Sequence, residues 1–248
     1  MTRIKALLTI KKKTSGRDSQ GHVSIRHRGG EQKRFLREID WRRDKIDIKA
    51  KVVSIEYDPG RTADIALLVY EDGAKSFILA STGLKVGDTV VSSENAPIKE
   101  GNCLPLKNIP VGVPIHCLSF IVNKGAQVVK SAGNAAYVQS IDGKKATIKL
   151  PSGEIRIFNA ESKATIGQVG NSEHSTQKLT KAGQKRLRGI RPTVRGVAQN
   201  PHSHPHGGGE GRSSIGMHPK TPWGKPAFKR TRKHKKASNK LIIQRRKK

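Results

Sequence analysis

The fold is decided by residues 46–61, whose sequence is IDIKAKVVSIEYDPGR. From Ile46 to Val52 apolar and polar residues alternate, and this period of two is typical of a half-buried β-strand. The parity changes at Val53 and the alternation continues to Tyr57, so we expect a β-bulge there. The following Asp-Pro-Gly supplies a tight turn. A bulged strand that ends in a turn is typical of small barrels.

The surrounding sequence predicts more short strands. They are expected at residues 65–70, 75–80 and 88–91 and, after a connector at 108–112, at 115–122, 136–141, 146–150 and 154–158. Asp-Gly and Pro-Ser-Gly sequences between several of them are turn residues of β-hairpins. This spacing, without an intervening helical pattern, predicts two small antiparallel barrels at roughly residues 30–105 and 106–170. One helix is expected at 175–188, capped by Ser175 or Thr176.

The charge is concentrated at the two ends of the chain. Residues 1–45 contain 14 lysines and arginines against 5 acidic residues, residues 46–175 contain 14 against 13, and residues 176–248 contain 21 against 1. A solvated surface would mix the signs, because like charges repel in a compact state. The ends therefore predict a polyanionic partner, which we take to be nucleic acid, with a solubilising tail as the alternative.

The sequence gives less support to a membrane partner, to a disulfide and to an organelle presequence. No run of eighteen apolar residues occurs, so we expect no membrane partner. Cys103 and Cys117 are expected to be buried thiols in a reducing compartment, with a disulfide as the alternative. The basic residues 1–13 favour an RNA-contacting arm over an organelle presequence, because their apolar stretch is short.

The last sixty residues show no apolar periodicity, so we expect residues 190–248 to gain order from a partner. His202, His204 and His206 have zinc-like spacing, but two prolines restrict them and only Glu210 is nearby, so no metal site is expected. The three glycines after His206 let backbone amides approach RNA closely, although a flexible linker has the same composition. Trp41 and Trp223 are candidates for base stacking or for packing.

Residues 191–212 read RPTVRGVAQNPHSHPHGGGEGR, and TPWG and a basic run follow. Further motifs are EYDPGR at 56–61, DGAKSFILA at 72–80, GLKVGD at 83–88, NIPVG at 108–112 and SAGN at 131–134. In these motifs and their order the sequence resembles the bacterial-type ribosomal protein L-two family. The resemblance implies a mainly β fold, with an OB-like barrel followed by an SH3-like barrel and long basic extended ends. The domains are then expected at residues 1–29, 30–105, 106–170 and 171–248.

The resemblance also implies a function. It predicts a structural constituent of the large ribosomal subunit, not an enzyme, that binds large-subunit ribosomal RNA and supports subunit association and the peptidyl-transferase region. The expected partners are that RNA, neighbouring ribosomal proteins and the small subunit, in cytoplasmic ribosomes or alternatively in organellar ones. We expect no cofactor, although the RNA can hold Mg or K ions.

The residues expected to contact RNA are Arg17, Arg26, Arg28, Arg42, Arg43, Arg186, Arg188, Arg191, Arg195, Asn200, His204, His206, Gly207, Gly208, Gly209, Arg212, Trp223, Arg230, Arg232 and Lys233. Arginine predominates because its planar fork donates two hydrogen bonds to phosphate. His204 matches a position for which the family has a proposed general base. Ser203 replaces the carboxylate that usually precedes it, and a serine cannot stabilise an imidazolium in the same way, so we expect an RNA contact.

Two rival functions remain. A free RNA chaperone or single-strand binder would need a stacking platform, but the chain has only ten aromatic residues. A hydrolase or transferase would need a nucleophile with a base, paired carboxylates or a phosphate-binding loop, and none of these is recognisable.

Overall fold

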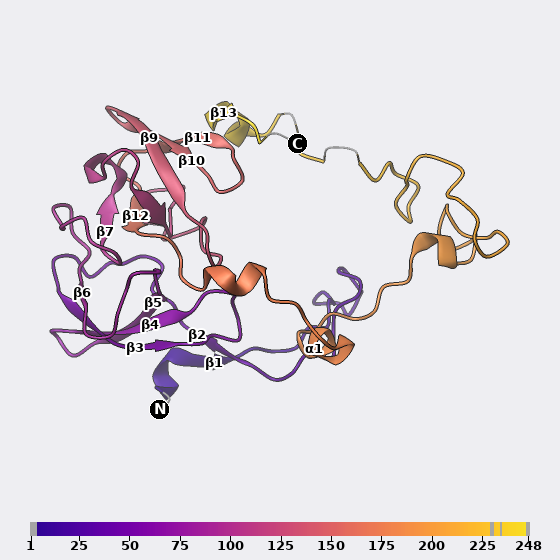
Figure 1. The fold of residues 1–248 in the computed structure, drawn as a ribbon, viewed down its shortest axis with the longest axis horizontal. Helices are drawn as coiled ribbons and strands as arrows, with labels where there is room; N and C mark the ends of the chain where they lie inside the picture. The colour runs from indigo at the N-terminus through magenta and orange to yellow at the C-terminus, as the bar shows by residue number, and fades with distance from the viewer. Residues whose placement is uncertain (1–3, 229–230, 234, 247–248) are drawn as a thin grey trace. The chain divides into compact units, whose positions relative to one another are not determined.

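The computed structural model describes residues 4–228, 231–233 and 235–246 (Figure 1). They form two compact units. The barrel module comprises the described parts of residues 1–11, 33–178 and 238–248. The basic module comprises residues 12–32 and the described parts of 179–237. The fold is mainly β, as predicted.

The first barrel is built on four antiparallel strands in the order β5-β4-β3-β6. Their bounds are β3 (Ala50–Glu56), β4 (Ile65–Tyr70), β5 (Lys75–Leu79) and β6 (Thr89–Val90). The register of β3 against β4 shifts between Val52 and Ser54, which confirms the predicted bulge. β3 does not begin at Ile46, as predicted, because Asp47 has a left-handed backbone with φ of 59°.

β4 lies at the centre of this sheet and is buried on both faces. Ala66 and Leu68 pack into one apolar cluster, and Ile65 and Leu67 pack into another. Its sequence is accordingly a continuous apolar run, not an alternating one. The Asp-Gly turn into β5 has Gly73 at φ 79°, with its N–H donating to the Tyr70 carbonyl. The predicted hairpin is therefore confirmed.

The second barrel is built on a seven-stranded sheet in the order β13-β11-β10-β9-β8-β12-β7. Its strands are β7 (Cys103–Pro105), β8 (Pro114–His116), β9 (Ala136–Asp142), β10 (Lys145–Lys149), β11 (Ile155–Asn159), β12 (Lys163–Ile166) and β13 (Ile242–Gln244). The strand predicted at 115–122 was too long, because Cys117 has φ of 50° and leaves the strand region. Three of these strands, β7, β12 and β13, were not predicted.

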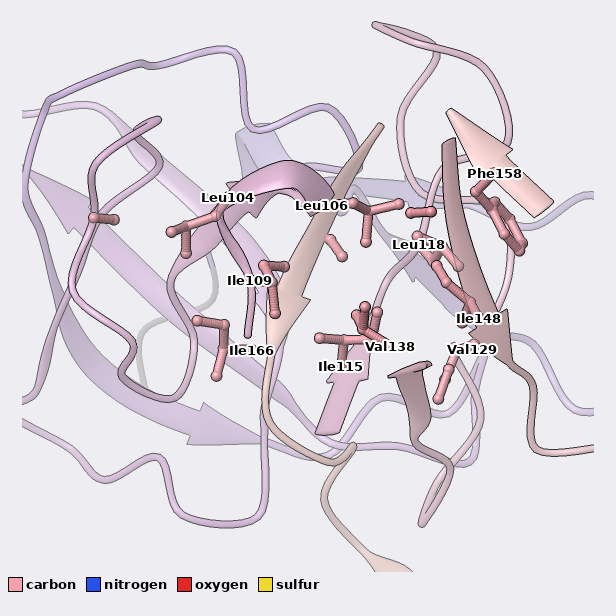
Figure 2. Close-up of a cluster of buried hydrophobic side chains, with 14 residues drawn as sticks. Leu104, Leu106, Ile109, Ile115, Leu118, Val129, Val138, Ile148, Phe158 and Ile166 are labelled. Atoms are coloured by element: carbon pink, nitrogen blue, oxygen red, sulfur yellow. The ribbon is translucent and has the colours of Figure 1, made fainter. Parts of the chain in front are cut away.

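The core of the second barrel lies against this sheet. Leu106, Ile115 and Ile148 point into one cluster and are fully buried (Figure 2). Each such side chain stabilises the fold by about 1.5–3 kcal/mol relative to exposure. Phe120 stacks on Phe158 at 5.2 Å between ring centroids and packs against the cluster.

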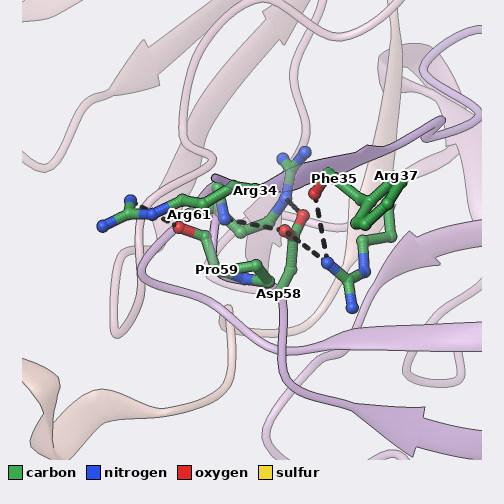
Figure 3. A network of polar contacts seen from close by, with 7 residues as sticks. Arg34, Phe35, Arg37, Asp58, Pro59 and Arg61 are labelled. Atoms are coloured by element: carbon green, nitrogen blue, oxygen red, sulfur yellow. Dashed lines mark hydrogen bonds and ion pairs between the residues drawn. The ribbon is translucent and has the colours of Figure 1, made fainter. Parts of the chain in front are cut away.

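The turn after β3 is fixed by a buried carboxylate (Figure 3). Asp58 is fully buried, and its Oδ1 accepts the Gly60 backbone N–H at 2.8 Å. Its Oδ2 accepts from Arg61 Nε at 2.5 Å, and Arg37 Nη1 lies 3.9 Å from Oδ1. Arg37 ends β2 (Phe35–Arg37), which pairs with β1 (Leu8–Ile10). The carboxylate thus ties the small two-stranded sheet to the first barrel.

In the described residues the helices are few and short. They are the α-helix α1 (Ala182–Leu187) and the 3-10 helices η1 (Lys5–Leu7), η2 (Leu106–Asn108), η3 (Ser172–Ser175), η4 (Gly196–Ala198) and η5 (Ala237–Leu241). The helix predicted at 175–188 was too long. α1 has no buried side chain and no side-chain cap at Lys181, so neither packing nor capping extends it. Among the described residues, no helix is long and apolar enough to cross a membrane.

Candidate nucleic-acid interface

The two basic ends of the chain are joined by backbone hydrogen bonds within the basic module. The Gly29 N–H donates to the Gly189 carbonyl at 3.0 Å, and the Arg191 N–H donates to the His27 carbonyl at 3.0 Å. Arg28 and Ile190 form an antiparallel bridge between these two bonds. The N-terminal arm and the segment after α1 therefore form one surface, which the sequence did not predict.

This surface carries an uncompensated positive charge. Residues 12–32 and 179–237 contain 20 lysines and arginines against three aspartates and glutamates. The predicted RNA contacts with charged or aromatic side chains that lie exposed here are Arg17, Arg26, Arg28, Arg186, Arg188, Arg191, Arg195, Arg212, Trp223, Arg232 and Lys233. Such a concentration of like charge is stable when a polyanion neutralises it.

The arginines between residues 186 and 212 are the cations best placed to bind phosphate. All five are exposed, and within the described part of the chain none has a side-chain hydrogen bond or ion pair. Arg17, by contrast, donates from Nη1 to the Gly21 carbonyl at 2.7 Å. A guanidinium without a protein partner keeps its forked donors for phosphate oxygens.

Residues 200–209 form a loop that folds around His204, whose exposed fraction is 7%. His204 Nδ1 accepts the backbone N–H of His206 at 3.0 Å, and the two ring centroids lie 4.7 Å apart. His206 Nε2 in turn accepts the Lys220 N–H at 3.0 Å. Desolvation, followed by His206 and Arg26, lowers the pKa of His204 and favours a neutral ring. His204 Nδ1 and His206 Nε2 therefore each accept a backbone N–H, so neither lone pair is available to bind a metal or to accept a proton from a substrate.

Glycine is required at one position of this loop and at one position of the 3-10 helix that precedes it. A Cβ at Gly196 would lie 2.5 Å from the His204 ring, and one at Gly207 would lie 2.5 Å from the Asn200 carbonyl oxygen. Asn200 also shapes the loop, because its Oδ1 accepts the His202 N–H at 3.0 Å. The predicted contacts Asn200, His204 and Gly207 thus hold the loop together. Gly208 and Gly209, in contrast, are exposed with φ of 87° and 97°.

The two tryptophans have different environments. Trp41 is half-buried in the barrel module, with Lys130 Nζ 4.4 Å and the Arg61 guanidinium 5.4 Å from its ring centroid. Its side chain packs against the apolar cluster that includes Ile65 and Leu67, so it is a packing anchor. Trp223 is 71% exposed and has the Arg26 guanidinium 4.9 Å from its ring centroid. Only Trp223 is placed to stack on a base.

Three predicted RNA contacts are not among the described residues of the basic module. Arg42 is exposed on the barrel module. Arg43 is 5% exposed, and its carbonyl accepts from Ser92 Oγ and Lys163 Nζ, so it is part of the barrel interior. Arg230 lies outside the described residues.

Ionisable groups buried in the barrel module serve packing. His116 is 1% exposed, and desolvation lowers its pKa to about 4 against the rise caused by its bond to the Gly167 carbonyl. Nδ1 of the neutral ring donates that bond at 2.9 Å. Cys103 and Cys117 are free thiols, as expected, but only Cys103 is fully buried and Cys117 is half-buried. Desolvation raises the pKa of Cys117 to about 12, so it is not a nucleophile at neutral pH. Among the described residues, no group of three or more His, Cys, Asp and Glu side chains is placed to hold a metal ion.

Sequence reasoning missed two lysines beside Trp223. Lys220 and Lys225 lie on either side of it in a short hairpin. The signal was the Thr-Pro-Trp-Gly sequence between them, because proline and glycine at this spacing indicate a tight turn.

Comparison with known families agrees with this architecture. A family model described as "Ribosomal Proteins L2, RNA binding N-terminal domain" matches residues 4–92, which include the first barrel. A second, described as "Ribosomal Proteins L2, C-terminal domain", matches residues 99–224, which include most of the second barrel and much of the basic module. The two matches cover most of the chain in the expected order. The chain therefore belongs to the ribosomal protein L2 family.

Proposed function

We propose that this chain, as a structural RNA-binding protein of the large ribosomal subunit, supports the peptidyl-transferase region and the joining of the two subunits. Its cations neutralise phosphates where RNA segments crowd together, which lowers the repulsion between those segments. Folded RNA then keeps the geometry that peptide-bond formation and subunit contact require. No catalytic turnover by the protein is involved.

The observation that carries this proposal is the junction of the two chain ends in the basic module. The module contains 20 lysines and arginines but only three aspartates and glutamates. Within the described chain, the side chains of the arginines from 186 to 212 have no hydrogen bond or ion pair. The barrel cores consist of apolar side chains and do not use those cations. The engaged Nδ1 of His204 favours a structural role over general-base catalysis.

The proposed partners are large-subunit ribosomal RNA, neighbouring ribosomal proteins and the small subunit. The proposed location is the cytoplasmic ribosome, with an organellar ribosome as the alternative. We propose no cofactor for the protein itself, and any Mg or K ions at the interface are held by the RNA.

The test compares large subunits reconstituted with and without the chain. Subunits without it should sediment less with small subunits and form peptide bonds more slowly, because their RNA is less well ordered. Adding the wild-type chain should restore both activities, and adding bovine serum albumin should not. Normal joining and normal peptide-bond formation without the chain would contradict the proposal.

A further inference from the structure

Trp223 lies at the tip of a small hairpin that presents it to solvent. The Gly224 N–H donates to the Thr221 carbonyl at 2.9 Å, which closes a β-turn with Pro222 and Trp223 at its centre. The Thr221 N–H donates to the Lys225 carbonyl at 2.7 Å, and Thr221 Oγ1 accepts the Lys225 N–H at 3.2 Å. The turn is therefore fixed by three hydrogen bonds, and its conformation does not depend on a core contact of Trp223.

The hairpin is fastened to the rest of the basic module. The Ala227 N–H donates to the Pro219 carbonyl at 2.8 Å within the hairpin itself, whereas the Lys220 N–H donates to His206 Nε2 at 3.0 Å and so joins the hairpin to the loop of residues 200–209. The Arg26 guanidinium lies 4.9 Å from the Trp223 ring centroid. The Arg26 guanidinium, from the N-terminal arm, thus covers one face of the indole and fixes the orientation of the ring.

An exposed tryptophan in such a place indicates a ligand with an aromatic face. At 71% exposure Trp223 buries little apolar area, so the isolated fold gains little from it. Lys220 and Lys225 are exposed and lie three residues before and two residues after Trp223, so the hairpin that carries the ring is positively charged. A planar group attached to phosphates satisfies both features, and an unpaired nucleotide is such a group.

We infer that Trp223 stacks on one unpaired nucleobase of the bound RNA, on the ring face opposite Arg26. The inference rests on the proposed function, because it assigns a nucleobase site within the same RNA-binding surface. Arg26 is a positioning residue that fixes the ring and limits stacking to a single base. Lys220 and Lys225 bind the phosphates that flank this base.

Tryptophan fluorescence tests the inference directly, because the chain has two tryptophans in different modules. Trp41→Phe leaves Trp223 as the only indole, and Trp223→Phe leaves Trp41. Each full-length protein is titrated with protein-free large-subunit ribosomal RNA and, separately, with inorganic polyphosphate, a polyanion without bases. Stacking should quench Trp223 on addition of RNA, whereas polyphosphate should bind without comparable quenching.

Affinity provides a second measurement by filter retention of the same RNA. Trp223→Ala should weaken binding by about 5- to 150-fold, the range for loss of one stacked base. Trp223→Phe should retain most of the affinity, because phenylalanine also has a π-face. If Trp41→Phe does not fold, the difference between wild type and Trp223→Phe gives the same quenching signal.

Two results would overturn the inference while the proposed function stands. One is RNA that is retained on filters without quenching Trp223, and the other is equal quenching by polyphosphate and RNA. Failure of the wild-type protein to retain RNA at all would instead refute the proposed function.

Discussion

The salt dependence of RNA binding measures how much of the interface the basic module supplies. The perturbation is a set of arginine-to-glutamine changes at exposed positions without protein partners. They are Arg186, Arg188, Arg191, Arg195 and Arg212. Glutamine keeps a polar side chain but removes the charge, and arginine is charged at every accessible pH, so pH does not complicate the comparison.

The magnitude follows from counterion release. If about eight to ten cations of the protein meet phosphates, the logarithm of affinity should fall against the logarithm of salt with a slope of roughly −7 to −9, taking the B-DNA coefficient. Five lost contacts should make the slope shallower by about 4 to 5. Between about 50 and 200 mM salt the wild-type affinity should then fall about 10⁵-fold, and that of the variant about 10²-fold.

The assay is filter retention of the same large-subunit RNA across a salt series. The control changes as many exposed lysines of the barrel module, namely Lys75, Lys85, Lys99, Lys149 and Lys51, to glutamine. It alters net charge equally and should leave the slope within about one unit of wild type. Equal changes of slope in both variants would show that net charge alone, and not the basic module, determines binding.

Further changes test the buried groups and the C-terminal strand. Asp58→Ala should lower the free energy of unfolding by about 3 kcal/mol in urea titrations, because two arginines lose a buried partner. Glu94→Ala removes an exposed ion pair and should lower the free energy of unfolding by at most about 1 kcal/mol. An equal loss of stability in the two variants would contradict this reasoning. The pKa of His116 is lower in the folded state than in the unfolded state, so stability should fall by up to about 3 kcal/mol as pH drops from 6.5 to about 4. His116→Asn should remove that part of the pH dependence, and an unchanged pH profile would refute it. Large subunits with His204→Ala should not show the roughly 10²- to 10⁴-fold loss of peptide-bond formation expected for a missing general base, and such a loss would establish catalysis. Ile242→Ser should speed amide exchange in β11 without changing the salt slope, and unchanged exchange would show that β13 does not protect β11.

The sequence predicted the strands of hairpins that are closed by short turns. β4 and β5 are joined by an Asp-Gly turn, so the turn residues and the apolar run together define the hairpin. β13 is different, because its partner β11 is more than eighty residues earlier and basic residues flank its short apolar run. Periodicity within a window cannot reveal such a distant pairing. The same holds for β7 and β12, which pair with each other across the second barrel.

The residue types of the interface were predictable from the sequence, but the backbone bonds that join the two chain ends were not. The bonds between Gly29 and Gly189 and between Arg191 and His27 are made by backbone atoms, so no side-chain motif indicates them. Arg42 and Arg43 are adjacent and chemically identical, yet one is exposed and the other buried. Arg43 also has a left-handed backbone, with φ of 54°.

The position of β13 shows that the basic segment is not a free tail. Residues 179–237 leave the barrel module after Lys178, the chain returns to it at Ser238, and β13 then pairs with β11. A segment held at both ends samples fewer conformations than a free tail, so it loses less entropy when RNA fixes it. Deleting residues 213–248 would therefore remove cations, release this constraint and uncover the edge of β11 in one step. Substituting arginines in place changes only the first of these, which is why charge substitution, and not truncation, isolates the electrostatic contribution.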